Sequence, residues 1–86
     1  MESVYVDASR WGRGVGSLLV DTVESTAVER NWLPLRLWVL EMNHRTRRWY
    51  EKRGWNREPG QRRTVWGQID DVGYALSEEG VNRWRR

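Results

Sequence analysis

The sequence contains no cysteine, which excludes a disulfide framework and catalysis by a thiol nucleophile. It contains one histidine, His44, and no cluster of histidine, aspartate or glutamate at metal-ligand spacing, so we expect no metal site. No stretch approaches the ~20 apolar residues of a membrane span, and no charged segment followed by an apolar one opens the chain. We therefore expect a cytoplasmic location and no membrane partner.

The chain is also short. Its 86 residues make one domain at most, and a chain of this size buries little more than about 60% of the surface that its unfolded form exposes. We expect a thin core whose stability comes from packing or from association.

Lysine is nearly absent, because Lys52 is the only lysine among fifteen basic residues. The net charge of +3 and the pI near 9.9 are consistent with an anionic partner, and arginine grips phosphate with a rigid fork of donors. Nucleic-acid binding is one interpretation of the arginines and interleaved aromatic residues. The other is that arginine is simply the usual surface cation here, and the twelve scattered acidic residues favour it. A nucleic-acid partner is thus the weaker expectation.

The segment 4–20 shows the clearest local pattern. Three strand-forming residues lead into a loop with Gly12, Gly14 and Gly16 at every second position, and an apolar helical pattern follows. Glycine lets a ligand approach the backbone closely, and the free N–H groups of a helix start attract phosphate. Arg13 can add positive charge. A turn of this kind also serves to pack a helix tightly on a sheet, so the pattern alone leaves both roles open.

The next elements extend this pattern. The apolar spacing predicts a helix over 14–30, with Asn31 suited to a left-handed cap. Alternation over 33–41 predicts a partly buried strand. A strand, helix and strand joined in this way are normally parallel and right-handed, so the glycine loop and the end of the second strand meet at one edge of the sheet.

A second helix is predicted over 45–53, with Asn43 as its cap and Gly54 as its left-handed end. Asn43 and Tyr50 lie nearly two turns apart on one stripe, and Trp49 beside them is expected to be buried. His44 is expected to face solvent. Beyond this helix we predict a loop over 56–63, strands over 64–69 and 71–76, and a polar basic tail over 77–86.

The two best-defined segments resemble the two main motifs of the GNAT superfamily of acyl-CoA-dependent N-acyltransferases. The first motif, Q/R-x-x-G-x-G/A, corresponds to Trp11, Gly12, Arg13, Gly14, Val15 and Gly16, with Trp11 in place of glutamine or arginine. The second has an asparagine near a helix start, a tyrosine seven residues later and a glycine-aromatic end, which here are Asn43, Tyr50, Gly54 and Trp55. The two motifs occur in the right order, separated by a helix and a strand.

The resemblance implies an α/β fold that is the C-terminal half of a GNAT domain over 1–76. We expect strand-helix-strand-helix followed by one or two strands in a mixed sheet. The family's preceding strands and helices, which usually shape the acceptor pocket, have no counterpart here. The strand at Val4 to Val6 would then be an open edge, so we expect a homodimer formed through it. A truncated reading of a longer gene is the alternative.

The resemblance also implies acetyl-CoA as co-substrate. Backbone groups of Val4 and Val6 would hold the pantetheine arm, and the amides from Gly12 to Ser17 would bind the pyrophosphate. Asn43 would contact the arm, and Tyr50 would protonate the leaving thiolate. The candidate cofactor-binding residues are therefore Val4, Val6, Trp11, Gly12, Arg13, Gly14, Val15, Gly16, Ser17 and Asn43.

The function expected from the resemblance is transfer of an acetyl group from acetyl-CoA to a primary amine by direct attack. Glu2 and Asp7, at the ends of the first strand, are weak candidates for the general base. The alternative is a non-catalytic acyl-CoA-binding or assembly module that lacks the acceptor-binding half. The sequence identifies neither the acceptor nor the length of the acyl chain.

Overall fold

The structure is a computed structural model that describes residues 4–8, 17–65, 67 and 69–85. Its elements, in chain order, are β1 (Val4–Asp7), α1 (Ser17–Glu29), β2 (Leu35–Leu40), α2 (His44–Lys52), β3 (Trp55–Val65), β4 (Ile69–Leu76) and α3 (Glu78–Asn82).

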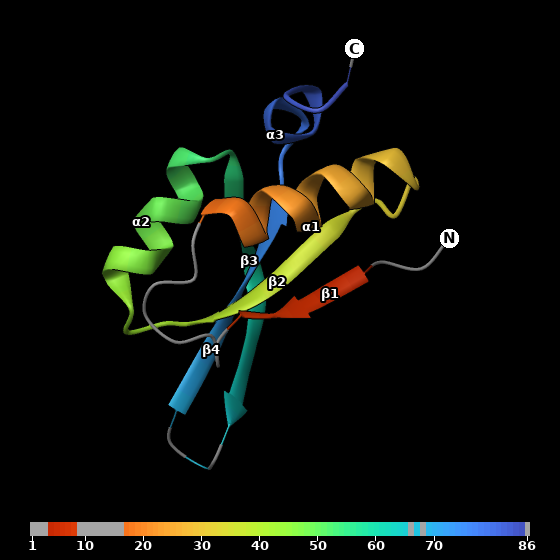
Figure 1. Cartoon of the computed structure of the whole chain (residues 1–86). Helices are drawn as coiled ribbons and strands as arrows, with labels where there is room; N and C mark the ends of the chain where they lie inside the picture. Colours follow the sequence, from red (N-terminus) through yellow and green to blue (C-terminus); the bar gives the residue numbers. More distant parts are fainter. Residues whose placement is uncertain (1–3, 9–16, 66, 68, 86) are drawn as a thin grey trace.

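The four strands form one mixed sheet in the order β1-β2-β4-β3 (Figure 1). β1 and β2 are parallel, with Val4 opposite Leu35 and Val6 opposite Leu37. β4 is antiparallel to both β2 and β3. The predicted α/β class, the mixed sheet and the parallel strand-helix-strand unit are confirmed.

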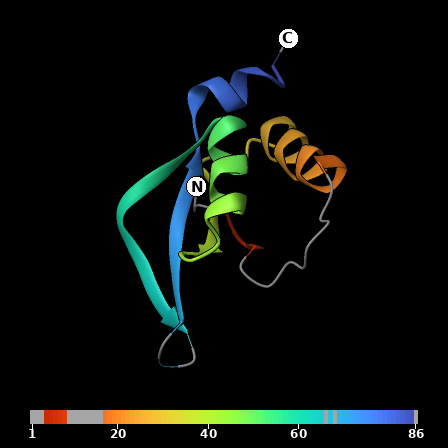
Figure 2. The same ribbon diagram turned by 90° about the vertical axis from the view of Figure 1, so that its left-hand side faces the viewer.

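The helices lie together on one side of the sheet, so the molecule has two layers (Figure 2). The side chains of β2 alternate between the two faces of the sheet. Leu35, Leu37 and Val39 are buried, and the residues between them are half-buried. Val72 and Tyr74 of β4 lie opposite Val39 and Leu37 and extend the same apolar surface. The core therefore lies between the sheet and the helices.

Two helix ends follow the sequence signals. Asn31 adopts a φ of 59° after α1, and Gly54 adopts a φ of 99° after α2. Both are left-handed conformations, which asparagine tolerates and glycine favours. The predicted caps at Asn31 and Gly54 are confirmed.

The predicted loop over 56–63 is wrong, because these residues belong to β3. The pairing with β4 is interrupted between Arg57 and Arg62 and then resumes. Pro59 and Gly60 fall in this interruption, where proline does not have to donate to the ladder. Pro59 and Gly60 therefore interrupt the pairing of β3 with β4 but do not end the strand.

The expectation that Trp49 is buried is also wrong, because its side chain is only half-buried. Consecutive residues of a helix point about 100° apart, and Tyr50 takes the position that faces the core. Trp49 instead contacts the Tyr50 ring edge-to-face at 5.1 Å and lies under the guanidinium of Arg53.

Candidate functional site

The candidate cofactor-binding residues at the first loop fall partly outside the described residues. Six of them are outside the described residues, and their roles remain predictions: Trp11, Gly12, Arg13, Gly14, Val15 and Gly16. Ser17 is the first residue of α1 and is exposed. The first turn of α1 carries no acidic side chain, so no carboxylate of that turn would repel an anion from the helix start.

Val4 and Val6 are half-buried on β1 and pack against the core cluster that contains Tyr50. β1 pairs with β2 along one side and is an edge of the described sheet along the other. An edge strand offers backbone N–H and C=O groups to an extended ligand or to another strand. The outer side of β1 can therefore act as a hydrogen-bonding strip.

Asn43 caps α2, as predicted. Its side-chain oxygen accepts a hydrogen bond from the backbone N–H of Thr46 at 3.2 Å. The residue is exposed. Because this bond uses only the oxygen, the two N–H donors of the side-chain amide do not take part in the cap.

Tyr50 is 2% exposed and projects from α2 into the core. The ring of Trp55 meets it edge-to-face at 5.8 Å. Burial raises the pKa of Tyr50 to about 12; Arg53 opposes this rise and Glu24 adds to it. The phenol therefore keeps its proton over the whole physiological range.

Glu24 lies beside this tyrosine and is completely buried. Its carboxylate accepts the indole N–H of Trp55 at 2.8 Å and that of Trp84 at 2.9 Å. Arg53 donates to both of its oxygens, at 3.3 and 3.2 Å, and also pairs with Asp21. One side chain of α1 thus ties together the end of α2, the start of β3 and the segment after α3.

Glu24 was not among the residues singled out from the sequence, and this network was not predicted. A signal was present, because Val20, Glu24 and Ala27 follow the i, i+4, i+7 spacing of a buried stripe. All three are buried. A charged residue in register with an apolar stripe indicates a buried ion pair.

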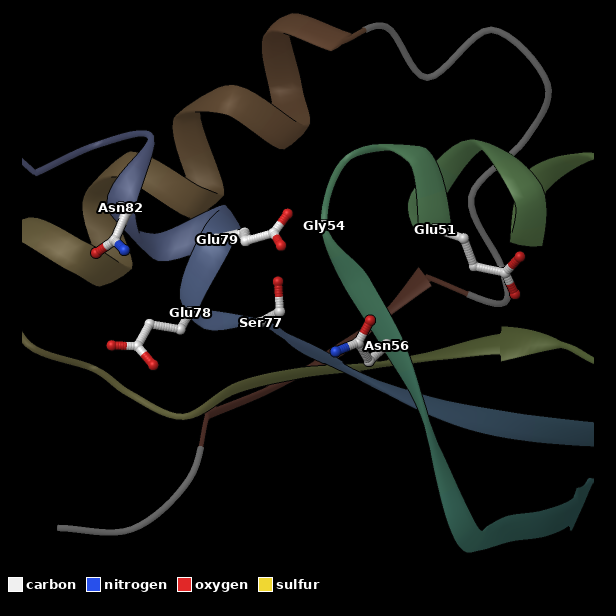
Figure 3. Close-up of a pocket in the computed structure, with 7 residues that line it drawn as sticks. All are labelled: Glu51, Gly54, Asn56, Ser77, Glu78, Glu79 and Asn82. Atoms are coloured by element: carbon white, nitrogen blue, oxygen red, sulfur yellow. The ribbon is translucent and has the colours of Figure 1, made fainter.

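A hollow of about 540 Å³ opens between the end of α2 and the start of α3 (Figure 3). It is lined by Glu51, Gly54, Asn56, Ser77, Glu78, Glu79 and Asn82. Ser77 and Glu79 point toward Gly54, whereas the carboxylates of Glu51 and Glu78 point outward (Figure 3). The lining has three carboxylates and no cation, so it does not suit a diphosphate, and it contains no predicted site residue.

Two other kinds of site have no support in the described part of the chain. No group of three or more histidine, aspartate or glutamate side chains is placed there to hold a metal ion. None of the described helices has the length and apolar character needed to cross a membrane. His44, the first residue of α2, is exposed as expected.

Comparison with known proteins gives one match. The chain matches the family model described as the acetyltransferase (GNAT) family over residues 1–55. No curated protein and no solved structure matches it. The matched region spans β1 through the start of β3 and includes both the glycine-rich segment and α2 with Asn43 and Tyr50. Because the match covers more than half of the 86 residues, the chain belongs to the GNAT acetyltransferase family.

Proposed function

We propose that the protein transfers an acetyl group from acetyl-CoA to a primary amine by direct attack. The observation that carries the proposal is the family match over 1–55, which includes α2 with Asn43 and Tyr50. The Tyr50 phenol is protonated at neutral pH, so it can donate a proton to a leaving thiolate and cannot serve as the base.

The cofactor would lie along β1 and across the start of α1. The outer edge of β1, at Val4 and Val6, supports binding of the pantetheine arm in the manner of an added strand. The exposed start of α1 at Ser17, with no acidic residue in its first turn, supports binding of the pyrophosphate by the amides from Gly12 to Ser17. Asn43 would contact the arm through the amide donors that its cap leaves unused.

The reaction needs no covalent enzyme intermediate. The uncharged amine forms a bond to the thioester carbonyl carbon, the amine gives up one proton to a base, and the carbon–sulfur bond breaks. The thiolate that leaves takes the proton of the Tyr50 hydroxyl, and the phenolate then recovers the proton that the base took from the amine. The protein's contribution is positioning and proton transfer.

A second candidate is a module that binds acyl-CoA, or assembles, without turnover. The observation that favours it is an uncovered sheet face: among the described residues, helices cover only one face of the sheet, and β1 is an edge of it. A homodimer through this edge is part of both proposals, and sedimentation of a stable monomer at micromolar concentration would count against it.

A cytoplasmic location is likewise proposed, consistent with the lack of cysteine.

Calorimetric and thermal-shift titrations with acetyl-CoA, free CoA and ATP test the ligand class first. We expect the two CoA species to bind and to raise Tm, and ATP not to. Equal effects of ATP and CoA would overturn a CoA site.

Turnover is tested next with a thiol reagent on a panel of amines. The chain has no cysteine, so the reagent reports only released CoA. We expect Tyr50→Phe to lower kcat by roughly 10²-fold or more, the usual contribution of a general acid, while acetyl-CoA still binds. Binding of CoA without turnover on any amine would favour the second candidate.

A further inference from the structure

The face of the sheet that the helices leave uncovered carries an ordered row of side chains. The rings of Tyr5 on β1 and Trp38 on β2 are stacked, with centroids 5.6 Å apart and planes at 18°. The guanidinium of Arg36 lies 5.8 Å from the Tyr5 centroid, and that of Arg63 lies 4.6 Å from the Trp38 centroid. Tyr5 is exposed and Trp38 is half-buried, and each ring attracts one guanidinium through its π face.

One end of this row is a group of two carboxylates and one guanidinium. Arg63 on β3 donates to Asp71 on β4 at 2.8 Å and to Asp7 on β1 at 2.9 Å. Asp7 lies opposite Trp38, and Asp71 lies opposite both Leu40 and Arg63. The Asp7–Trp38 pair and the Leu40–Asp71–Arg63 row are two residues apart along β2, so the Arg63 side chain links the two rows diagonally across the sheet.

Asp71 is the unusual member of this group. It is 1% exposed, and only its Oδ2 is bound by Arg63. Its other oxygen, Oδ1, is buried and has no hydrogen-bond partner in the part of the chain that the structure describes. A buried carboxylate oxygen without a donor is unfavourable, and native proteins normally satisfy such an atom with a ligand, an ion or water.

The neighbouring residue on β3 provides an internal comparison. Arg62 also lies between two carboxylates, Glu41 at one side and Asp70 at the other. There Arg62 binds both oxygens of Glu41, and the two oxygens of Asp70 are bound by Thr64 and Arg62. Both carboxylates are a third exposed. The unsatisfied acceptor is therefore a property of the Arg63 group and not of paired carboxylates in general.

We propose that the group formed by Asp71, Asp7 and Trp38 binds a cationic nitrogen of the acetyl acceptor, with the ammonium donating to Asp71 Oδ1. This inference rests on the proposed function. Asp7 ends β1, and Leu40, opposite Asp71, ends β2. The group therefore lies at the carboxyl end of the parallel strands, where ligands of α/β sheets bind and from which the glycine-rich segment continues.

The chemistry of the site defines the acceptor further. A nitrogen held as an ammonium by carboxylates has no lone pair, so it cannot be the nitrogen that attacks the thioester. The acceptor then carries a cationic group in addition to the uncharged amine that is acetylated, as a singly protonated diamine does. Asp71 acts on this view as a positioning residue for the acceptor.

The first experiment titrates the wild-type protein, without acetyl-CoA, with n-butylammonium chloride and separately with n-butanol. The Trp38 indole signal is followed in ¹H–¹⁵N spectra at constant ionic strength. We expect a saturable shift with butylammonium and none with butanol. The same response to both compounds, or no response, would overturn the proposal.

The second experiment compares Arg63→Gln with Arg62→Gln. Removing Arg63 leaves two carboxylates without a shared cation, so we expect butylammonium to bind roughly tenfold more tightly and to restore the Tm that the substitution lowers. Arg62→Gln makes the same chemical change at the exposed pair and should show neither effect. Equal gains in both variants would mean nonspecific ion pairing and would refute the site.

Loss of butylammonium binding is tested with Asp71→Asn. The control variant is Glu79→Gln, which removes an exposed carboxylate from the hollow near α3. We expect Asp71→Asn to abolish the butylammonium shift and Glu79→Gln to keep it. If Asp71→Asn does not fold, the wild-type titration and the Arg63→Gln comparison still decide the question.

Turnover separates this proposal from the proposed function. With wild type we expect a lower KM for 1,4-diaminobutane than for n-butylamine, and Asp71→Asn should raise the diamine KM to the monoamine value with kcat retained. Equal KM values for both amines in wild type would refute the positioning role but leave the acetyltransferase intact. Failure to bind acetyl-CoA would refute the acetyltransferase, whatever the butylammonium titration gives.

Discussion

Trp84 donates its indole N–H to the Glu24 carboxylate at 2.9 Å, although the two residues are 60 positions apart. Trp84 follows α3, and Glu24 lies in the middle of α1. Val81, on α3 itself, is buried in the core cluster. The segment after β4 is thus joined to the core by Val81 and to the first helix by a hydrogen bond to a charged group.

This relationship predicts that Glu24 is among the most sensitive positions of the chain. Glu24→Ala leaves Arg53 and two indole N–H groups without their common acceptor, so we expect the free energy of unfolding to fall by about 3–5 kcal/mol. Urea unfolding measures the change. Glu29→Gln, in the exposed end of the same helix, should change stability by less than about 0.5 kcal/mol. A similarly small effect at Glu24 would contradict the network.

The same contact predicts that the segment 77–86 contributes to stability. Trp84→Phe keeps a ring but loses the N–H donor to a buried carboxylate, which should cost about 1.5–3 kcal/mol. Thermal unfolding of Trp84→Phe and of the exposed control Trp32→Phe measures the difference. If both variants unfold at the wild-type temperature, the segment is a tail that does not stabilise the domain, as expected from its polar sequence.

Tyr50 should titrate abnormally late. Its pKa in the folded protein is about 12, whereas an exposed tyrosine ionises near 10. The unfolded chain therefore loses this proton before the folded one does, so the stabilising contribution is present below pH ~10 and is lost as the pH rises to about 12. Ultraviolet absorbance of phenolate should show an ionisation near pH 12 that disappears in Tyr50→Phe.

Tyr5→Phe is the matched control for that titration, because Tyr5 is 43% exposed. The ionisation near pH 12 should persist in this variant. Burial also raises the pKa of Tyr74, with a further rise from its hydrogen bond to Glu51, so Tyr74→Phe identifies its separate contribution. Ionisation of Tyr50 near pH 10 would show that its hydroxyl is open to water.

Gly73 on β4 should not tolerate a side chain. A Cβ there would lie 2.7 Å from the Cβ of Gln61, which crosses over from the irregular part of β3. We expect Gly73→Ala to destabilise the protein by about 1–3 kcal/mol, as overpacking does. Because the clash is with Cβ itself, Gln61→Gly in the same chain should recover part of the loss, and Gln61→Ala should not. Additive losses in the double variants would contradict this contact.

The parts of the fold that were predicted from sequence are those with local signals. Asn43 and Gly54 bound α2 because capping and left-handed turns depend on a single residue type. The alternation in β2 and the helical spacing of α1 likewise depend on neighbours in sequence. These signals identified the family and the helix that bears Asn43 and Tyr50.

The parts that were not predicted depend on distant partners. β3 continues past Pro59 and Gly60 because β4 pairs with it on both sides of the interruption. Glu24 is buried because Arg53 and Trp55, 29 and 31 residues later, provide its donors. The pairing of Arg63 with both Asp7 and Asp71 likewise joins residues 56 and 8 positions apart. No local pattern encodes such pairs.

The sheet order has a consequence for how the chain acquires its structure during synthesis. β4 lies between β2 and β3 and is the antiparallel neighbour of both. Neither β2 nor β3 can form this pairing until residues 69–76 have emerged from the ribosome. Earlier in translation, β2 can pair only with β1, and β3 has no place in the sheet. Stepwise folding behind the ribosome is therefore disfavoured, and the nascent chain exposes unpaired strand edges, a state prone to aggregation, until β4 inserts.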